Sequence, residues 1–270
     1  ISFSSKFNES VVMPKISEIS ARHELLHKLP LTGGAVTFLN ECSDKSLFSN
    51  AAIENDVSKE EAYSVLRLEN AKGSGDTGLI INNLKHAVKV MKKIPQSDEP
   101  FALTHDFIKN IHMHITFDTR APGNIPGSYR TKEASVKHFQ PPKYFVKELM
   151  EDFVKWFESG EIKSLHPFIR AVLAHYHSMM IHPFGDGNGR TARFIESSIL
   201  KKAGYDYLAL VMPIFYYENK GEYFRKFHSS EKSGGFNLTP FVDFAIDGAL
   251  RSLNMVFDVF TGELYKLAMD

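Results

Sequence analysis

The stretch from residue 181 to residue 193, IHPFGDGNGRTAR, brings together an imidazole, a carboxylate, several glycines and two arginines. Gly187, Asn188 and Gly189 can adopt the positive φ angles that turn successive backbone N–H groups toward one point. Because a helix that begins at this turn adds its positive dipole end, the turn should bind an anion. The residue types therefore predict a phosphate site.

The charged side chains of this stretch suit a nucleotide and its metal ion. Arg190 and Arg193 are three positions apart on the first turn of the following helix, so both guanidinium groups can reach one phosphate chain. Asp186 offers the carboxylate oxygen that Mg²⁺ binds together with phosphate oxygens. His182 is the nearby group that exchanges a proton near neutral pH. These residues predict a nucleotide held by its phosphates beside a base.

Three familiar glycine-containing loops do not fit this stretch. A P-loop needs a lysine after its glycines, and none follows here. The Rossmann fingerprint lies between a strand and a helix, whereas these glycines follow a segment with helical periodicity. An EF-hand needs three oxygen ligands before its glycine and a later glutamate, which this loop lacks. A plain helix–loop–helix turn is the remaining alternative to a phosphate site.

The same stretch resembles the signature of the Fic domain, H-x-F-x-[DE]-G-N-[GK]-R-x-x-R, without a departure. The matching residues are His182, Phe184, Asp186, Gly187, Asn188, Gly189, Arg190 and Arg193. The resemblance implies that His182 deprotonates a hydroxyl of a target protein and that Asp186 holds the metal on the α- and β-phosphates of ATP. It also implies an anion hole formed by Asn188 and the glycine amides, with Arg190 and Arg193 on the β- and γ-phosphates.

The reaction that the resemblance implies is AMPylation, in which AMP passes from ATP to a serine, threonine or tyrosine hydroxyl of a target protein and pyrophosphate leaves. Gly189 agrees with this reaction, because the Doc-like branch that transfers phosphate carries lysine there. Two alternatives stay open: the same site could remove AMP from a modified protein, or the domain could sense nucleotides without catalysis. The expected ligands are ATP and Mg²⁺, and association as a homodimer is left open.

Glu54 has the features of an inhibitory residue. We expect Asn50 to cap the start of a short helix and Asn55 to end it in a left-handed conformation, which places Glu54 at a helix C-terminus. A carboxylate is unfavourable there, so a cationic partner is expected. The run NAAIEN is similar to the [ST]-x-x-x-E-[GN] motif of Fic proteins, with asparagine in place of serine or threonine. The resemblance implies that Glu54 pairs with Arg193 and restrains the reaction. Glu69 is a second candidate without the flanking pattern, and a solvated surface glutamate is the plain alternative.

Residues 128–139, SYRTKEASVKHF, are the best candidate for extended structure, since turn signals precede them and two prolines follow. Their start is similar to the β-hairpin flap of Fic proteins. That resemblance implies that Val136, Lys137 and His138 align a segment of the target protein by strand addition. An ordinary surface hairpin is the alternative.

Tyr223 stands where Fic proteins place aromatic contacts to the adenine.

Helical periodicity covers most of the chain and predicts a mainly α fold. Apart from the short helix before Glu54, the expected helices are residues 14–29, 58–68, 80–91, 101–117, 144–157, 165–180, 189–202 and 238–267, the last as one helix or a pair. The histidines at 105, 112, 114, 175 and 177 are interpreted as structural or surface residues, not metal ligands. With the resemblance, we expect a Fic-type helical bundle with a small β-hairpin flap. Its parts would be an N-terminal helical region with the inhibitory helix (1–95), the Fic core (96–236) and C-terminal helices (237–270).

Composition excludes several kinds of partner. The chain has 270 residues, 43% of them hydrophobic, which is enough for a full core. Its 32 basic and 32 acidic residues cancel, so nucleic acid is not an expected partner. No long apolar run or signal-peptide core is present, and Cys42 is the single cysteine, so no disulfide framework can form. These features predict a soluble cytoplasmic protein without a membrane partner.

Overall fold

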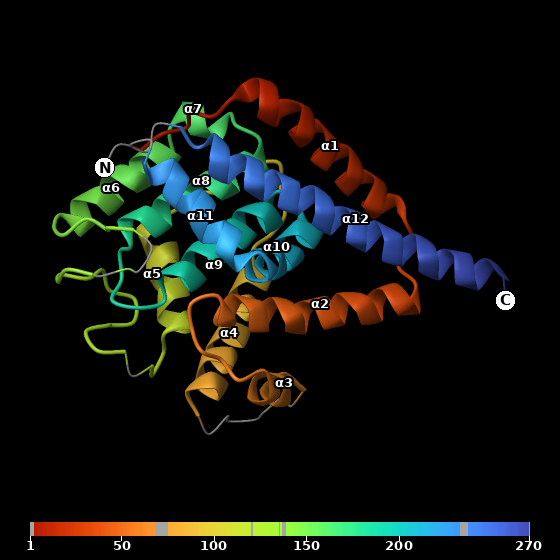
Figure 1. The fold of residues 1–270 in the computed structure, drawn as a ribbon, viewed down its shortest axis with the longest axis horizontal. Coiled ribbons are helices and arrows are strands. Elements are labelled where there is room, and N and C mark those ends of the chain that lie inside the picture. The colour runs from red at the N-terminus through yellow and green to blue at the C-terminus, as the bar shows by residue number, and fades with distance from the viewer. Residues whose placement is uncertain are drawn as a thin grey trace.

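The protein is mainly α-helical (Figure 1). A computed structural model describes residues 3–67, 75–119, 121–134, 136, 139–232 and 237–269. Its helices are α1 (Glu9–Lys28), α2 (Gly33–Ala52), α3 (Lys59–Arg67), α4 (Asp76–Lys92), α5 (His105–Ile115), α6 (Val146–Phe157), α7 (Gly160–Lys163), α8 (Pro167–Ile181), α9 (Asn188–Lys202), α10 (Asp206–Glu218), α11 (Lys220–Lys232) and α12 (Thr239–Met269). The prediction of a mainly α fold is confirmed. The predicted β-hairpin is not found, because none of the described residues lies in a strand.

Two buried helices, α8 and α9, form the centre of the fold and carry the loop 182–187 between them. Most side chains of both helices are buried, so neither has the polar face of a surface helix. Pro167 begins α8 where its missing N–H has no intrahelical partner to lose, and the His166 side chain accepts a hydrogen bond from the Phe168 N–H. The loop therefore projects from two buried helices at the centre of the fold.

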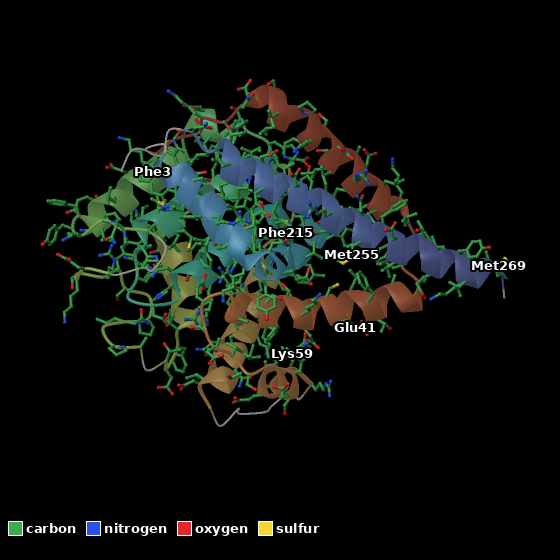
Figure 2. The ribbon with its side chains drawn as sticks, in the orientation of Figure 1. Phe3, Glu41, Lys59, Phe215, Met255 and Met269 are labelled. Carbon is green, nitrogen blue, oxygen red and sulfur yellow. The ribbon has the colours of Figure 1, made fainter. Side chains whose placement is uncertain are left out.

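The outer helices cover this pair from two sides. In Figure 1, α1 and α12 lie along one side, and α2, α3 and α4 lie on the other. Phe215 of α10 lies in the interior (Figure 2) and packs on Gly248 of α12, where a Cβ would collide with the ring. The predicted C-terminal segment is one helix of 31 residues. Neither α12 nor any other helix in the described ranges is long and apolar enough to cross a membrane.

The helix before Glu54 is longer than predicted. α2 runs for 20 residues and ends at Ala52, because residues along its length are buried against α10 and α4. Asn50 therefore lies in the last turn of α2, and the prediction that it caps the start of a short helix is wrong. Asn55 does not adopt a positive φ either. Its side-chain amide instead donates to the Ala51 carbonyl at 2.9 Å and caps the helix end.

Two buried histidines should make the fold sensitive to acid. His112 and His177 are 0% and 1% exposed, and burial lowers the pKa of each to about 4. In the unfolded chain a histidine titrates near pH ~6.5, so the unfolded state binds more protons than the folded state below that pH. The free energy of unfolding should therefore fall as the pH drops from ~6.5 toward 4. At pH 5 the expected loss is about 2 kcal/mol for each histidine.

Urea unfolding at pH 7 and pH 5 measures this loss. In His177→Gln, whose amide can still donate to the Ser4 carbonyl that lies 2.9 Å from Nε2, the difference between the two pH values should shrink by about 2 kcal/mol. His86→Gln changes an exposed histidine and should leave the difference as it is. Equal pH dependence in wild type and His177→Gln would contradict the expectation.

Candidate active site

The loop 182–187 is fixed by its backbone conformation and by hydrogen bonds within it. His182 ends α8 with φ 52° and ψ 59°, in the left-handed region that residues other than glycine seldom occupy. Gly187 precedes α9 with φ 72°, a conformation that suits glycine. Asn188 closes the loop, because its Oδ1 accepts from the Phe184 N–H at 2.8 Å and its Nδ2 donates to the Phe184 carbonyl at 2.9 Å. These two bonds fix the Asn188 side chain, and its backbone N–H at the start of α9 is a donor that can face an anion.

Arg130 ties the loop to the segment 130–142. Its Nε donates to the His182 carbonyl at 2.7 Å, and its backbone N–H donates to the Pro183 carbonyl at 2.8 Å. Nη1 and Nη2 donate to the carbonyls of Lys132 and Pro142 at 2.8 and 2.6 Å. Arg130 is 8% exposed, and these carbonyls satisfy its buried charge. The sequence places Arg130 at the start of the flap-like segment and carries no local sign of its bond to the His182 carbonyl.

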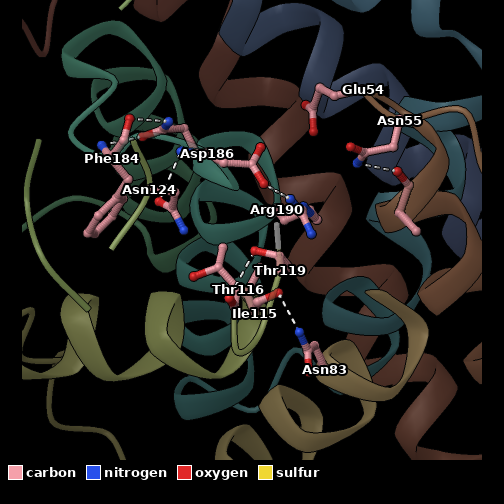
Figure 3. Close-up of polar contacts among 12 residues, drawn as sticks. Glu54, Asn55, Asn83, Ile115, Thr116, Thr119, Asn124, Phe184, Asp186 and Arg190 are labelled. Carbon is pink, nitrogen blue, oxygen red and sulfur yellow. Dashed lines mark hydrogen bonds and ion pairs between the residues drawn. The ribbon is translucent and has the colours of Figure 1, made fainter. Parts of the chain in front are cut away.

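Asp186 is positioned by α5 and by the turn 121–127. Its backbone N–H donates to Oδ1 of Asn124 at 3.1 Å (Figure 3), and its carbonyl lies 3.0 Å from Nε2 of His112. Nδ1 of His112 accepts from the Gly127 N–H at 3.0 Å, so the ring proton is on Nε2, which donates to Asp186. The His112 ring also stacks on Phe184, with centroids 3.6 Å apart. Sequence reasoning interpreted His112 as structural and had no signal for this contact with the loop.

The loop and the start of α9 line a cavity of about 470 Å³. The first backbone N–H groups of α9 have no acceptor within the helix. Arg190 is 1% exposed: its Nη2 donates to Oδ2 of Asp186 at 2.8 Å, while Nε and Nη1 have no hydrogen-bond partner among the described residues. A buried guanidinium with unused donors favours an anion beside it. Figure 3 shows Asp186, Arg190 and Glu54 directed toward the same region.

His182 lines the same cavity and can accept a proton. Burial and, next, the positive charge of Arg130 lower the pKa of its imidazole to about 4, against the opposite effect of the Glu54 and Asp186 carboxylates. The ring is therefore neutral at pH 7, with a lone pair on one nitrogen. The residue that sequence reasoning selected as a base is thus in a protonation state that suits a base.

Glu54 forms a bidentate ion pair with Arg193. Oε1 accepts from Nη1 at 2.7 Å, and Oε2 accepts from Nη2 at 2.9 Å. Arg193 is fully buried, and Asn50 accepts two further hydrogen bonds from it, at Oδ1 (2.8 Å) and at the backbone carbonyl (3.0 Å). Burial alone would raise the pKa of Glu54, but the charge and hydrogen bonds of Arg193 and the charge of Arg190 hold it below the usual value. The carboxylate is therefore ionised at neutral pH.

Gly189 lets Glu54 lie directly on the first turn of α9. A Cβ at position 189 would collide with the Glu54 carboxylate. This position is where the dipole and the free N–H groups of the helix favour a negative charge. Glu54 therefore lies where the start of α9 favours a negative charge. The second candidate, Glu69, lies outside the described residues.

The structure describes one of the three predicted flap residues. Val136 lines the cavity, whereas Lys137 and His138 lie outside the described residues. Residues 128–134 and Val136 contain no strand, which corrects the prediction of a hairpin in the described part of this segment. Within this segment the buried side chain of Arg130 binds the carbonyl of Lys132, a group that a hairpin can pair with a backbone N–H.

Tyr223 is buried and does not line the cavity, and its contact with adenine stays a prediction. It is 0% exposed, and its hydroxyl lies 2.9 Å from Nε2 of His175, whose Nδ1 is 2.7 Å from Glu196. The residues of α11 that line the cavity are Phe224 and Lys220. Successive side chains on a helix point about 100° apart, so a shift of one position along α11 exchanges the core for the cavity.

Replacing Arg130 by methionine should disturb His182 without removing a side chain that lines the cavity. The pKa of His182 should rise, because a positive charge that lowers it is lost. Loss of the buried hydrogen bonds should also cost about 2–4 kcal/mol of stability. NMR titration of the His182 ring measures the pKa, and Lys132→Met, at an exposed position, is the control. A His182 pKa that stays the same in folded Arg130→Met would contradict this expectation.

Comparison with known proteins agrees with this geometry. Residues 102–200, which include the loop and most of α9, match the Fic/DOC family. This part of the chain is a Fic domain. Protein adenylyltransferase fic-1 of Caenorhabditis elegans is 35% identical over 118 residues, which are 43% of this chain and 22% of that protein. Protein adenylyltransferase Fic of Drosophila melanogaster is 32% identical over 130 residues, 48% of this chain and 25% of that protein. The match thus spans about a quarter of these relatives' length.

Solved structures of Fic proteins share the fold around this domain. A segment of Fic-1 from C. elegans superposes with a TM-score of 0.77 at 20% identity, covering 94% of this chain and 74% of that one. A Fic family protein from Desulfovibrio desulfuricans gives a TM-score of 0.74 at 21% identity, covering 94% of this chain and 75% of that one. The helices outside residues 102–200 therefore also follow the arrangement seen in these solved structures.

Proposed function

We propose that the Fic domain transfers AMP from ATP to a serine, threonine or tyrosine hydroxyl of a target protein. The observation that carries the proposal is the shared cavity of the His182 imidazole and the anion site at the start of α9. A base and a phosphate site in one cavity suit the attack of a hydroxyl on a phosphorus atom. The names of the relatives, protein adenylyltransferases, support the same reaction.

In the proposed step, His182 takes the proton of the target hydroxyl while its oxygen forms a bond to the α-phosphorus of ATP. The bond from the α-phosphorus to the bridging oxygen breaks, and pyrophosphate leaves with the electron pair. Arg190, with its unused Nε and Nη1 donors, and the free N–H groups of α9 stabilise the negative charge of the phosphates. The loop conformation fixes His182 relative to these donors.

Magnesium fits this site as an ion that arrives with the nucleotide. The Asp186 side chain is 34% exposed and lines the cavity. The described residues contain no group of three or more His, Cys, Asp or Glu that could hold a metal by itself. Mg²⁺ commonly binds one or two carboxylates together with phosphate oxygens and water. Asp186 would be its protein ligand, and the ion would neutralise charge on the α- and β-phosphates.

Glu54 would restrain this reaction. Its carboxylate uses two guanidinium nitrogens of Arg193 and lies on Gly189, so a γ-phosphate directed at Arg193 would meet a negative charge. ATP could then bind with its phosphates displaced from the position needed for in-line attack. Release of Glu54 would free Arg193 for the γ-phosphate.

Removal of AMP from a modified protein is the second candidate function. The observation that favours it is that Glu54 and His182 line one cavity, close enough for the charge of Glu54 to raise the pKa of His182. A water between them could be positioned by the carboxylate for attack on a phosphodiester. In this reaction Glu54 is required, whereas in AMP transfer it is inhibitory.

The experiment that tests the proposal compares two labels on ATP. Glu54→Gly protein is incubated with Mg²⁺ and ATP labelled at the α- or at the γ-phosphate, and label on protein is followed. AMP transfer predicts label from the α-phosphate only, a mass increase equal to AMP and release of pyrophosphate. Label from the γ-phosphate would instead show phosphate transfer. ATP binding without either label on this chain or on added cell proteins would favour a nucleotide-sensing module.

Loss of AMP from the labelled protein tests the second candidate. The AMP-modified Glu54→Gly protein is added to fresh wild type or to fresh Glu54→Gly protein. Faster loss with wild type would support hydrolysis that needs Glu54. Equal rates would contradict it.

A further inference from the structure

A second cavity lies behind the last turn of α2, away from the catalytic loop. It measures about 190 Å³ and is lined by residues of α2, α4, α9 and α10. In Figure 1 the C-terminal end of α2 meets α4, with α9 and α10 beside it. The space is partly open to solvent and large enough to admit a small ligand from the surface.

The interior of this cavity is apolar. Its buried lining includes Leu47, Phe194, Ala209 and Pro213. Pro213 leaves the Ala209 carbonyl without a helical N–H donor, but the Ser197 hydroxyl donates to that carbonyl at 3.1 Å. The interior therefore offers few free polar groups to hold water molecules. An engineered apolar cavity of ~150 Å³ binds benzene, so this space can take an apolar chain of about six carbons.

The mouth of the cavity has an excess of positive charge. Lys92, Lys201 and Asp206 line it, and Lys201 pairs with Asp206 at 3.3 Å. Lys92 is exposed and forms no ion pair within the part of the chain that the structure describes. One cation therefore stays without a counter-charge beside an apolar pocket. An apolar chain that carries one carboxylate would satisfy both features.

The cavity also borders the ion pair between Glu54 and Arg193. Asn50 lines it and accepts two hydrogen bonds from Arg193, and Phe194 follows Arg193 along α9. A ligand in the cavity would thus pack against Asn50 and Phe194, the two residues that flank Arg193. A ligand shifts an equilibrium by its difference in affinity between two states, so one that packs on Asn50 and Phe194 as they lie beside the paired Arg193 would favour that pairing.

We propose that this cavity binds a small amphipathic carboxylate of the short-chain fatty-acid class, and that binding strengthens the Glu54–Arg193 contact. The proposal of a binding site depends on the cavity alone, whereas the proposal of an effect on catalysis rests on the proposed function. The apolar chain lies against Phe194 and Leu47, and the carboxylate lies beside Lys92.

Calorimetric titration of the full chain with hexanoate tests the binding site. Hexanoate should bind wild type, and Lys92→Glu should weaken binding at least tenfold. Lys89→Glu, an exposed lysine one turn away that does not line the cavity, should change it less than twofold. Leu210→Trp should fill the space and abolish binding. Absence of hexanoate binding would overturn the site, and equal affinity for hexanoate and 1-hexanol would overturn the role of the carboxylate.

The link to Glu54 has a readout that does not depend on catalysis. Coupling between two sites is reciprocal, so Glu54→Gly should weaken hexanoate binding on the order of fivefold. Unchanged affinity in Glu54→Gly would overturn the link and leave the site itself intact. Hexanoate should also lower AMP transfer by wild type and not by Glu54→Gly. If no variant transfers AMP, the proposed function fails, while the calorimetric results still decide the site.

Discussion

Glu54→Gly should transfer AMP on the order of 10–100-fold faster than wild type, the range expected when a coupling of about 1–3 kcal/mol is removed. In the wild type, Arg193 donates to both carboxylate oxygens of Glu54, and the carboxylate lies on Gly189 at the start of α9. The substitution removes a negative charge from the anion site and frees Nη1 of Arg193. Asn50 still holds Nε and Nη2, so the guanidinium keeps its orientation.

The same variant should be less stable than wild type, which separates an effect on rate from an effect on folding. Glu54→Gly leaves part of a buried guanidinium without an acceptor, which should lower the free energy of unfolding by about 1–3 kcal/mol. A faster reaction in a less stable protein cannot come from improved folding. Initial rates with α-labelled ATP measure the effect, and Glu60→Gly, an exposed glutamate outside the cavity, is the matched control. A rate equal to that of wild type, with ATP bound, would contradict restraint by Glu54.

Loss of the His182 imidazole should reduce AMP transfer by about 10²–10⁴-fold in the Glu54→Gly background, the usual contribution of a general base. His182→Asn is the most informative variant, because asparagine tolerates the left-handed conformation found at this position and so preserves the loop. The phosphate site would remain, since Arg190 and the start of α9 are unchanged. The loss should therefore appear in kcat rather than in ATP affinity.

Rates and ATP affinity are measured together to separate the base from the loop. His182→Asn should bind ATP within about twofold of the parent, as expected when only a transition-state interaction is removed. His86→Asn, at an exposed position, controls for the change of residue type. Full activity in His182→Asn would exclude His182 as the base. Loss of ATP binding would show instead that the substitution had disturbed the loop.

The helices that carry the loop could be predicted closely from the sequence. The expected helix at 165–180 corresponds to α8 and the one at 189–202 to α9, because strong apolar periodicity and local end signals coincide there. The helix before Glu54 could not be delimited in this way. Its polar residues carry no periodic signal, and burial against α10 and α4 extends it. Residues 128–134 have the residue types of a strand, yet the buried side chain of Arg130 binds the carbonyl of Lys132 among them.

The sequence by itself determined the chemistry of the loop, because His182, Asp186, the glycines and Arg190 are close in the chain and one turn brings them together. Only the tertiary structure decided how that loop is held and which carboxylate meets Arg193. Glu54 meets Arg193 across 139 positions, and His112 supports Asp186 across 74. Such contacts depend on how helices pack, and local residue patterns specify which face of a helix is buried but not which helix will cover it.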